Sequence, residues 1–133
     1  MTEKLFLARG IFLLIAWRLR LQFVPFNRLL TQLAGQPLAQ PAARLERQRL
    51  LWIFRAACRL IPLTTCLSRA MAGYILLCRY GLAPTLHIGV AKDPEQELAA
   101  HAWLTLAGQV VVGHIPDLER FRELPPIVSR APK

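Results

Sequence analysis

Two residues that are remote in sequence have the types needed for a nucleophilic site, Cys66 and His101. Cys66 follows Thr64 and Thr65 and opens a segment with helical apolar spacing. It is therefore expected at a helix N-terminus, where unpaired N–H groups and the helix dipole favour a thiolate. A thiolate nucleophile needs a base that takes its proton and later delivers it to the leaving amine. His101 is the candidate base, while a purely structural role for Cys66 as a small buried side chain stays open.

The remaining cysteines and histidines indicate no second centre. Cys58 and Cys78 lie in apolar helical segments, where cysteine usually packs as a small hydrophobe. The chain has neither CxxC nor HxxxH spacing, so no metal and no cofactor is expected. His87 is expected to be an exposed strand residue. Trp103 alternates with His101, so it either shields the Cys–His pair, lines a substrate pocket or belongs to the core.

Apolar periodicity changes along the chain from helical to strand-like near residue 81. Helices are predicted over 5–23, 26–33, 43–61 and 66–80, with Pro25, Pro62 and Gly81 as stops and Thr64 or Thr65 as the last cap. Strands are predicted over 85–90, 101–106 and 109–112, a helical turn over 117–124, and a loose tail beyond it. This order predicts an α+β fold in a single domain.

The composition limits the class of protein. The chain has 133 residues, of which 54% are hydrophobic, which is too apolar for a disordered chain. The longest apolar stretch, 5–17, contains Arg9 and is short of the roughly 20 residues that span a bilayer. No signal-peptide cleavage site closes it, so a cytoplasmic location is expected. The surplus apolar surface is expected to cover a partner, a peptide or a membrane surface.

Positive charge is confined to the first part of the sequence. Residues 1–80 hold 12 Lys and Arg against 2 Glu, whereas residues 81–133 hold 5 against 6 acidic residues. The arginines stand singly among leucines, which is typical of solvated faces of amphipathic helices rather than of a nucleic-acid site. Peripheral contact with an anionic membrane, or attraction to an acidic peptide, stays open.

Three motifs together resemble a known family. The strings TTCLSRAMAGYILLCRYGLAPTLHIGV and AHAWLTLAGQVVVG are similar to the lasso-peptide leader peptidases known as B2 proteins, which look like the cysteine-protease half of the microcin J25 maturation protease. The family pattern is CLxRA at a helix start, then LLxRxGxxxxLxIGV, then AHAWxxxxGxVV. The matching residues are Cys66, Leu67, Arg69, Ala70, Leu76, Leu77, Arg79, Gly81, Leu86, Ile88, Gly89, Val90, Ala100, His101, Ala102, Trp103, Gly108, Val110 and Val111.

The resemblance implies a fold, an activity and partners. It implies a helical N-terminal part over 1–62 and a papain-like or transglutaminase-like core over 63–133, in which the cysteine helix packs on a small antiparallel sheet. The implied activity is removal of the leader from a ribosomally made lasso precursor, with Cys66 as nucleophile and His101 as base. The implied partners are the precursor's leader peptide, a separate B1 recognition protein (a RiPP recognition element) and a cyclase that joins the freed amine.

One position departs from the family pattern. The family usually places an aspartate twelve residues after the histidine, where this chain has Gly113. A three-residue hairpin loop would set residue 113 opposite His101, and a two-residue turn would set His114 there. The residue that orients the imidazole is then Asp117, His114, a backbone carbonyl or none. Asp117 as a helix N-cap and His114 as a surface residue are equally open.

The missing aspartate also supports a different class of function. A chain without an orienting carboxylate could be a catalytically weak module that binds the precursor or the cyclase without cutting. A third alternative is an adaptor that uses the basic helices on a membrane surface.

Overall fold

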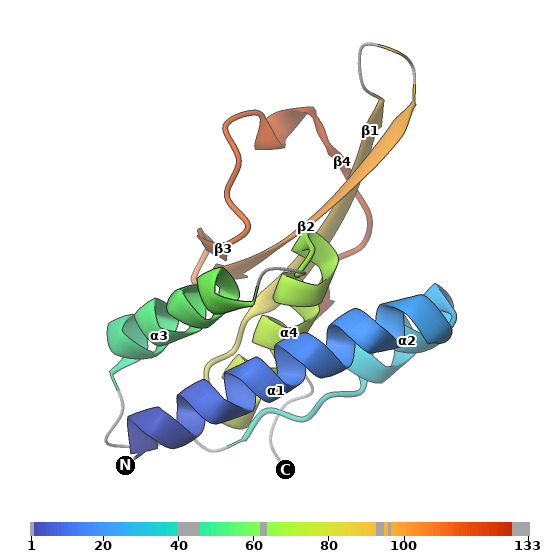
Figure 1. The fold of residues 1–133 in the computed structure, drawn as a ribbon. Helices are drawn as coiled ribbons and strands as arrows, with labels where there is room; N and C mark the ends of the chain where they lie inside the picture. Colours follow the sequence, from blue (N-terminus) through green and yellow to red (C-terminus); the bar gives the residue numbers. More distant parts are fainter. Residues whose placement is uncertain (1, 40–45, 62–63, 93–94, 96, 129–133) are drawn as a thin grey trace.

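The computed structural model describes residues 2–39, 46–61, 64–92, 95 and 97–128. It shows helices first and an antiparallel sheet after them, which confirms the predicted α+β fold (Figure 1). The helices are α1 (Thr2–Phe23), α2 (Phe26–Ala34), α3 (Arg47–Leu60) and α4 (Cys66–Arg79). The strands are β1 (Thr85–Lys92), β2 (Leu98–Leu106), β3 (Gln109–Val112), β4 (Arg122–Glu123) and β5 (Ile127–Val128), with a 3-10 helix η1 (Leu118–Arg120) before β4.

The helices follow from the predicted periodicity and stops. α1 ends at Phe23 because the residue before Pro25 is biased away from the helical region. α3 keeps its apolar stripe inward through Leu50, Phe54 and Ala57, all of them buried. The predicted helix 43–61 starts with three residues that lie outside the described part of the chain.

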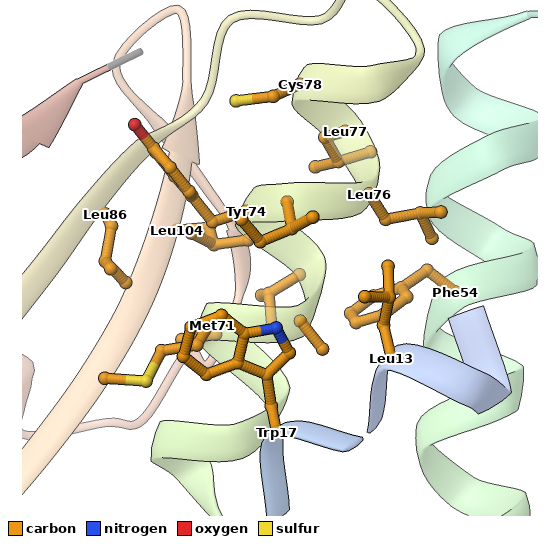
Figure 2. Packing of buried hydrophobic residues seen from close by; sticks show 14 of the residues in the cluster. Leu13, Trp17, Phe54, Met71, Tyr74, Leu76, Leu77, Cys78, Leu86 and Leu104 are labelled. Atoms are coloured by element: carbon orange, nitrogen blue, oxygen red, sulfur yellow. The ribbon is translucent and has the colours of Figure 1, made fainter. Parts of the chain in front are cut away.

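Helix α4 is the centre of the core. Every residue from Ala70 to Cys78 is buried. Figure 2 shows α4 between two groups of side chains, with Leu13 of α1 and Phe54 of α3 on one side and Leu86 and Leu104 of the sheet on the other. The same buried cluster draws on all four helices and on β1, β2 and β3. The helical front and the sheet therefore share a single core.

The sheet is antiparallel, with strand order β3-β2-β1-β4, and β5 also pairs with β1. β1 and β2 pair along their whole length, from Thr85 opposite Thr105 to Lys92 opposite Leu98. Figure 1 shows that this long hairpin extends past the start of α4. Alternate residues of β2, such as Ala102 and Leu104, are fully buried in the core cluster around α4. His101 and Trp103 therefore belong to the opposite face of the sheet, which points away from α4.

The β2–β3 hairpin has the two-residue turn, but its register then shifts. Leu106 pairs with Gln109, and both turn residues between them have positive φ, as a type I′ turn requires. Between Leu104 and Thr105 the pairing shifts, which leaves Val111 as an extra residue in β3. The expectation that a two-residue turn sets His114 opposite His101 is therefore wrong, because this β-bulge moves the following chain by one position.

The segment after η1 corrects two predictions: the helical turn predicted over 117–124 is confined to η1, and the tail beyond it is not loose. Arg122 and Glu123 pair with β1 as β4, and Ile127 and Val128 pair with β1 as β5. The backbone N–H of Leu124 also donates to Ile88 O at 2.8 Å. A strand of two residues has no hydrophobic periodicity that could be recognised in the sequence. β4 and β5 are therefore identified only by their pairing with β1 in the structure. Residues 129–133 lie outside the described part of the chain.

The outer side of α1 is left uncovered. Phe12 and Phe23 are 69% and 79% exposed, and Figure 1 shows α1 running across the front of the molecule. Leu5, Ile15 and Leu19 are also exposed along this side. Over the ranges described, no helix has the length and apolar character needed to cross a bilayer.

Candidate active site

Cys66 is the first residue of α4, and a capping box fixes that helix start. The N–H of Ser68 donates to Thr65 Oγ1 at 3.2 Å, and the N–H of Thr65 donates to Ser68 Oγ at 2.8 Å. Of the two predicted caps, the structure therefore uses Thr65. The Thr64 hydroxyl instead accepts from Arg69 Nε at 2.7 Å. These bonds hold Cys66 at the positive end of the core helix, where an oxyanion or a thiolate is stabilised.

The Cys66 thiol lies against β2 immediately before His101. Its Sγ donates to the carbonyl oxygen of Ala100 at 3.9 Å, and the residue is half-buried. The start of α4 and the middle of β2, which are 34 residues apart in sequence, thus meet at this point.

His101 is held by a backbone carbonyl from the segment after β3. Its Nε2–H donates to Gly113 O at 2.6 Å. In the neutral form of the imidazole, a proton on Nε2 places the lone pair on Nδ1. Gly113, which stands where the lasso leader peptidases that the motifs resemble carry an aspartate, thus supplies the acceptor through its main chain. Of the four predicted alternatives for the orienting group, the structure shows the backbone carbonyl in contact.

Gly113 can place its carbonyl there only because it has no side chain. Its φ is +88°, in the region that glycine adopts at no steric cost. A Cβ on this residue would lie 2.7 Å from Ala102 O and 3.0 Å from Trp103 Cβ. An aspartate therefore does not fit at position 113 with this backbone.

Two aromatic side chains fix the plane of the His101 ring. Trp103 stacks on it with centroids 5.9 Å apart at 17°, and Phe121 lies 5.8 Å away at 48°. Gly89, the β1 partner of His101, lies beneath both of them, since a Cβ there would be 2.9 Å from Phe121 Cβ and 3.2 Å from the indole. Trp103 is buried and stacks on His101, and its role as shield, pocket wall or core residue stays a prediction.

Asp117 and His114 lie outside the hydrogen-bonded group around His101 in the described ranges, although the charge of His101 is among the smaller causes that lower the pKa of the Asp117 carboxyl. The Asp117 carboxylate accepts from Arg120 Nε at 2.5 Å, and this hydrogen bond lowers the pKa of that carboxyl below its usual value. Asp117 occupies the N-cap position of η1 without a side-chain capping bond. His114 is exposed. Neither side chain is hydrogen-bonded to His101 in the portion of the chain described here.

The structure brings Cys66 to the backbone of the residue before His101 but does not join the two side chains, because His101 belongs to the face of β2 that points away from α4. The thiol contacts Ala100 O, while the imidazole faces Gly113 O, Trp103 and Phe121. Among the described residues no hydrogen bond links Cys66 to His101. Catalytic hydrogen bonds are often long or poorly aligned without substrate and tighten only when it binds.

Sequence reasoning missed a second imidazole beside Trp103. His87 was expected to be exposed, but its side chain is only 16% exposed and stacks on Trp103 with centroids 5.3 Å apart at 6°. One ring nitrogen contacts Glu123 and the other lies 2.8 Å from Thr105 Oγ1. The register that sets His87 opposite Trp103 is the signal that could have revealed this stack.

The other cysteines are thiols without disulfide bonds, packed in the core or against it. Burial raises the pKa of the Cys58 thiol to about 11, although Arg69 and Arg59 nearby oppose this. Cys78 is fully buried. Within the described ranges, no group of three His, Cys, Asp or Glu side chains lies close enough to hold a metal ion.

Comparison with known proteins decides the family. The family model described as the transglutaminase-like superfamily matches residues 11–125, well over half of the chain. The protein belongs to the transglutaminase-like superfamily. This superfamily includes cysteine peptidases and transglutaminases, so it fits an acyl-transfer chemistry that starts from a cysteine. The matched region of this superfamily member runs from α1 through β4 and includes both Cys66 and His101. A search of curated proteins and a search of solved structures each find no significant match.

Proposed function

We propose that this protein is a cysteine peptidase that removes the leader from a ribosomally synthesised lasso-peptide precursor. The observation that carries the proposal is Cys66 at the capped N-terminus of the core helix, in contact with the residue before His101, within a transglutaminase-like fold. The motifs that surround both residues resemble those of the lasso leader peptidases, and this supports the choice of substrate.

In the proposed reaction, Cys66 acts as the nucleophile and His101 as the base and then the acid. Nδ1 of His101 takes the thiol proton, and the Cys66 sulfur attacks the carbonyl carbon of the last leader residue. Backbone N–H groups in the first turn of α4 receive the oxyanion. The C–N bond then breaks, and His101 returns the proton to the departing core amine. Water hydrolyses the remaining thioester, which releases the leader as a carboxylate and restores the thiol.

The proposal also includes protein partners and a cellular location. A separate recognition protein presents the leader, a cyclase consumes the freed amine, and the reaction occurs in the cytoplasm, where the precursor is made. The basic character of residues 1–80 supports contact between the helical front and an acidic partner or peptide.

The test is cleavage of the matching precursor in the presence of its recognition protein, followed by mass spectrometry. Wild-type protein is expected to yield separate leader and core masses. Cys66→Ala and His101→Ala are expected to yield none, whereas Cys58→Ala, a matched change at another half-buried thiol, is expected to keep cleavage. Unchanged cleavage by Cys66→Ala would remove the basis of the proposal.

A binding module without peptidase activity is the second candidate. Two observations favour it: the Cys66 thiol donates to Ala100 O rather than to His101, and Gly113 stands where the family carries an aspartate. This candidate predicts that precursor and recognition protein bind to the chain while the precursor stays intact. It also predicts that iodoacetamide modifies Cys66 no faster than an ordinary free thiol at neutral pH.

A further inference from the structure

We propose that Arg55 is a positioning residue for His101 and acts through the β-bulge at Val111. This inference rests on the role of His101 as the base in the proposed function. It concerns a residue on α3, remote from the family motifs, whose side chain touches neither Cys66 nor His101 among the described contacts.

The first link is a two-pronged contact between α3 and β3. Nε and Nη2 of Arg55 donate to the carbonyl oxygen of Val111 at 2.9 and 2.7 Å. Val111 is the residue that the register shift leaves without a partner in β2. A bulge breaks the ladder of hydrogen bonds locally, and a carbonyl released from the ladder needs another donor. The guanidinium supplies two charge-assisted donors from one rigid group.

The second link runs from the bulge to Gly113. Only Val112 separates Val111 from Gly113, and the extra residue moves the chain forward relative to β2. Gly113 therefore lies against Ala102 and Trp103, since a Cβ added at this position would come within about 3 Å of both residues. Its positive φ then turns the carbonyl toward the His101 ring.

The third link is the bond from His101 Nε2 to Gly113 O at 2.6 Å. This bond selects the tautomer with a lone pair on Nδ1, the nitrogen that the proposed reaction uses as base. If Arg55 releases Val111, the register of β3 is free to slip, and the carbonyl that selects this tautomer moves away. In a triad, an orienting residue fixes the imidazole by a direct contact. Arg55 thus replaces the missing aspartate in this role, but it acts by holding the backbone segment that contacts His101.

The experiment compares two arginines of the same helix. Arg55→Met removes both donors to Val111 O while keeping an unbranched side chain. Arg47→Met is the matched control, because Arg47 makes one bond of 3.3 Å to Leu106 O, at the turn end of the hairpin. Arg55→Lys keeps the charge but not the forked donor geometry, and serves both as the conservative variant and as a milder change if Arg55→Met fails to fold.

The decisive readout is the tautomer of His101, measured by nitrogen-15 NMR on the full chain. Wild type and Arg47→Met are expected to show the proton on Nε2. Arg55→Met is expected to lose this preference and Arg55→Lys to recover part of it. In the cleavage assay, Arg55→Met is expected to lower kcat by about 10²-fold with little change in KM, because a displaced base affects the chemical step rather than binding.

An unchanged His101 tautomer in folded Arg55→Met or Arg55→Lys would overturn the inference, as would an equal loss in Arg47→Met. The NMR measurement does not need peptidase activity. A wild-type protein that fails to cleave the precursor contradicts the proposed function, whereas the link from Arg55 to the His101 ring is still decided by the tautomer.

Discussion

At the scale of residues, the site depends on a main-chain group in place of a side chain. The carbonyl of Gly113 accepts from His101 at the position where the lasso leader peptidases that the motifs resemble carry an aspartate. The departure at residue 113 could be seen in the sequence, and a backbone carbonyl was among the predicted substitutes. Its selection could not be predicted, because it depends on the bulge at Val111 and on the donors from Arg55.

Gly113→Ala is expected to be more damaging than Gly108→Ala. Both glycines have positive φ, but a Cβ at Gly108 meets nothing within 4 Å, whereas at Gly113 it meets Ala102 O at 2.7 Å. We expect Gly108→Ala to cost about 1 kcal/mol of unfolding free energy and Gly113→Ala about 2–3 kcal/mol. Urea titration measures both. Equal losses would show that the backbone near Ala102 adjusts freely.

The Cys58 thiol is expected to make the fold sensitive to alkali. Its pKa is raised from 9.0 to about 11 by burial, so the folded state favours the neutral thiol. This contribution to stability is complete below about pH 9 and is lost as pH rises toward 11, because the unfolded chain releases the proton first. Urea midpoints measured from pH 8 to 11 should fall less in Cys58→Ala than in wild type. A parallel fall in both proteins would contradict this assignment.

At the scale of elements, the helices could be predicted and the sheet edges could not. The apolar periodicity and the flanking prolines predicted α1 to α4 within a few residues, and Cys66 was correctly expected at a helix start. β4 and β5 were missed because two residues carry no periodic signal. The environment of His87 was missed for a related reason, since it depends on Glu123 of β4 and on Trp103 across the β1–β2 ladder.

Two buried glycines should respond in opposite directions to alanine. A Cβ at Gly73 of α4 would lie 2.9 Å from both Phe54 and Leu104, so Gly73→Ala overfills the junction of α3, α4 and β2. We expect it to cost about 1–3 kcal/mol. A Cβ at Gly10 of α1 meets Leu76 at an ordinary 3.4 Å, and the helix gains about 0.5–1 kcal/mol from alanine there. Thermal unfolding of the two variants checks both signs.

At the scale of the whole molecule, a basic helical front is joined to a near-neutral sheet. Residues 1–80 carry a net charge of +10, and Cys66, the first residue of the last helix in this part, contacts β2. The uncovered side of α1 belongs to the basic part and presents apolar residues in helical succession. A contiguous apolar surface of this kind marks an interaction site in most monomeric proteins. We expect it to contact the recognition protein, the leader or the cyclase.

A double change on this surface tests that expectation. Phe12→Ser with Phe23→Ser removes the two most exposed aromatic side chains of α1 and should weaken binding to the recognition protein with its bound leader by at least about tenfold. Leu98→Ser, at a residue 75% exposed on β2, is the matched control and should bind as wild type does. Unchanged binding by the double variant, measured by calorimetry, would contradict a protein partner on α1. Salt-sensitive binding to anionic vesicles would then assign the face to a membrane surface.

The central claim is that Cys66 forms a covalent bond with the leader, and mass mapping of an acid-quenched reaction tests it most directly. Wild-type protein mixed with precursor and recognition protein should carry the leader as a thioester, labile to hydroxylamine, on the peptide that contains Cys66. Release of the core peptide should accompany formation of this adduct. An adduct on another residue, or core release at the wild-type rate by Cys66→Ala, would contradict the claim.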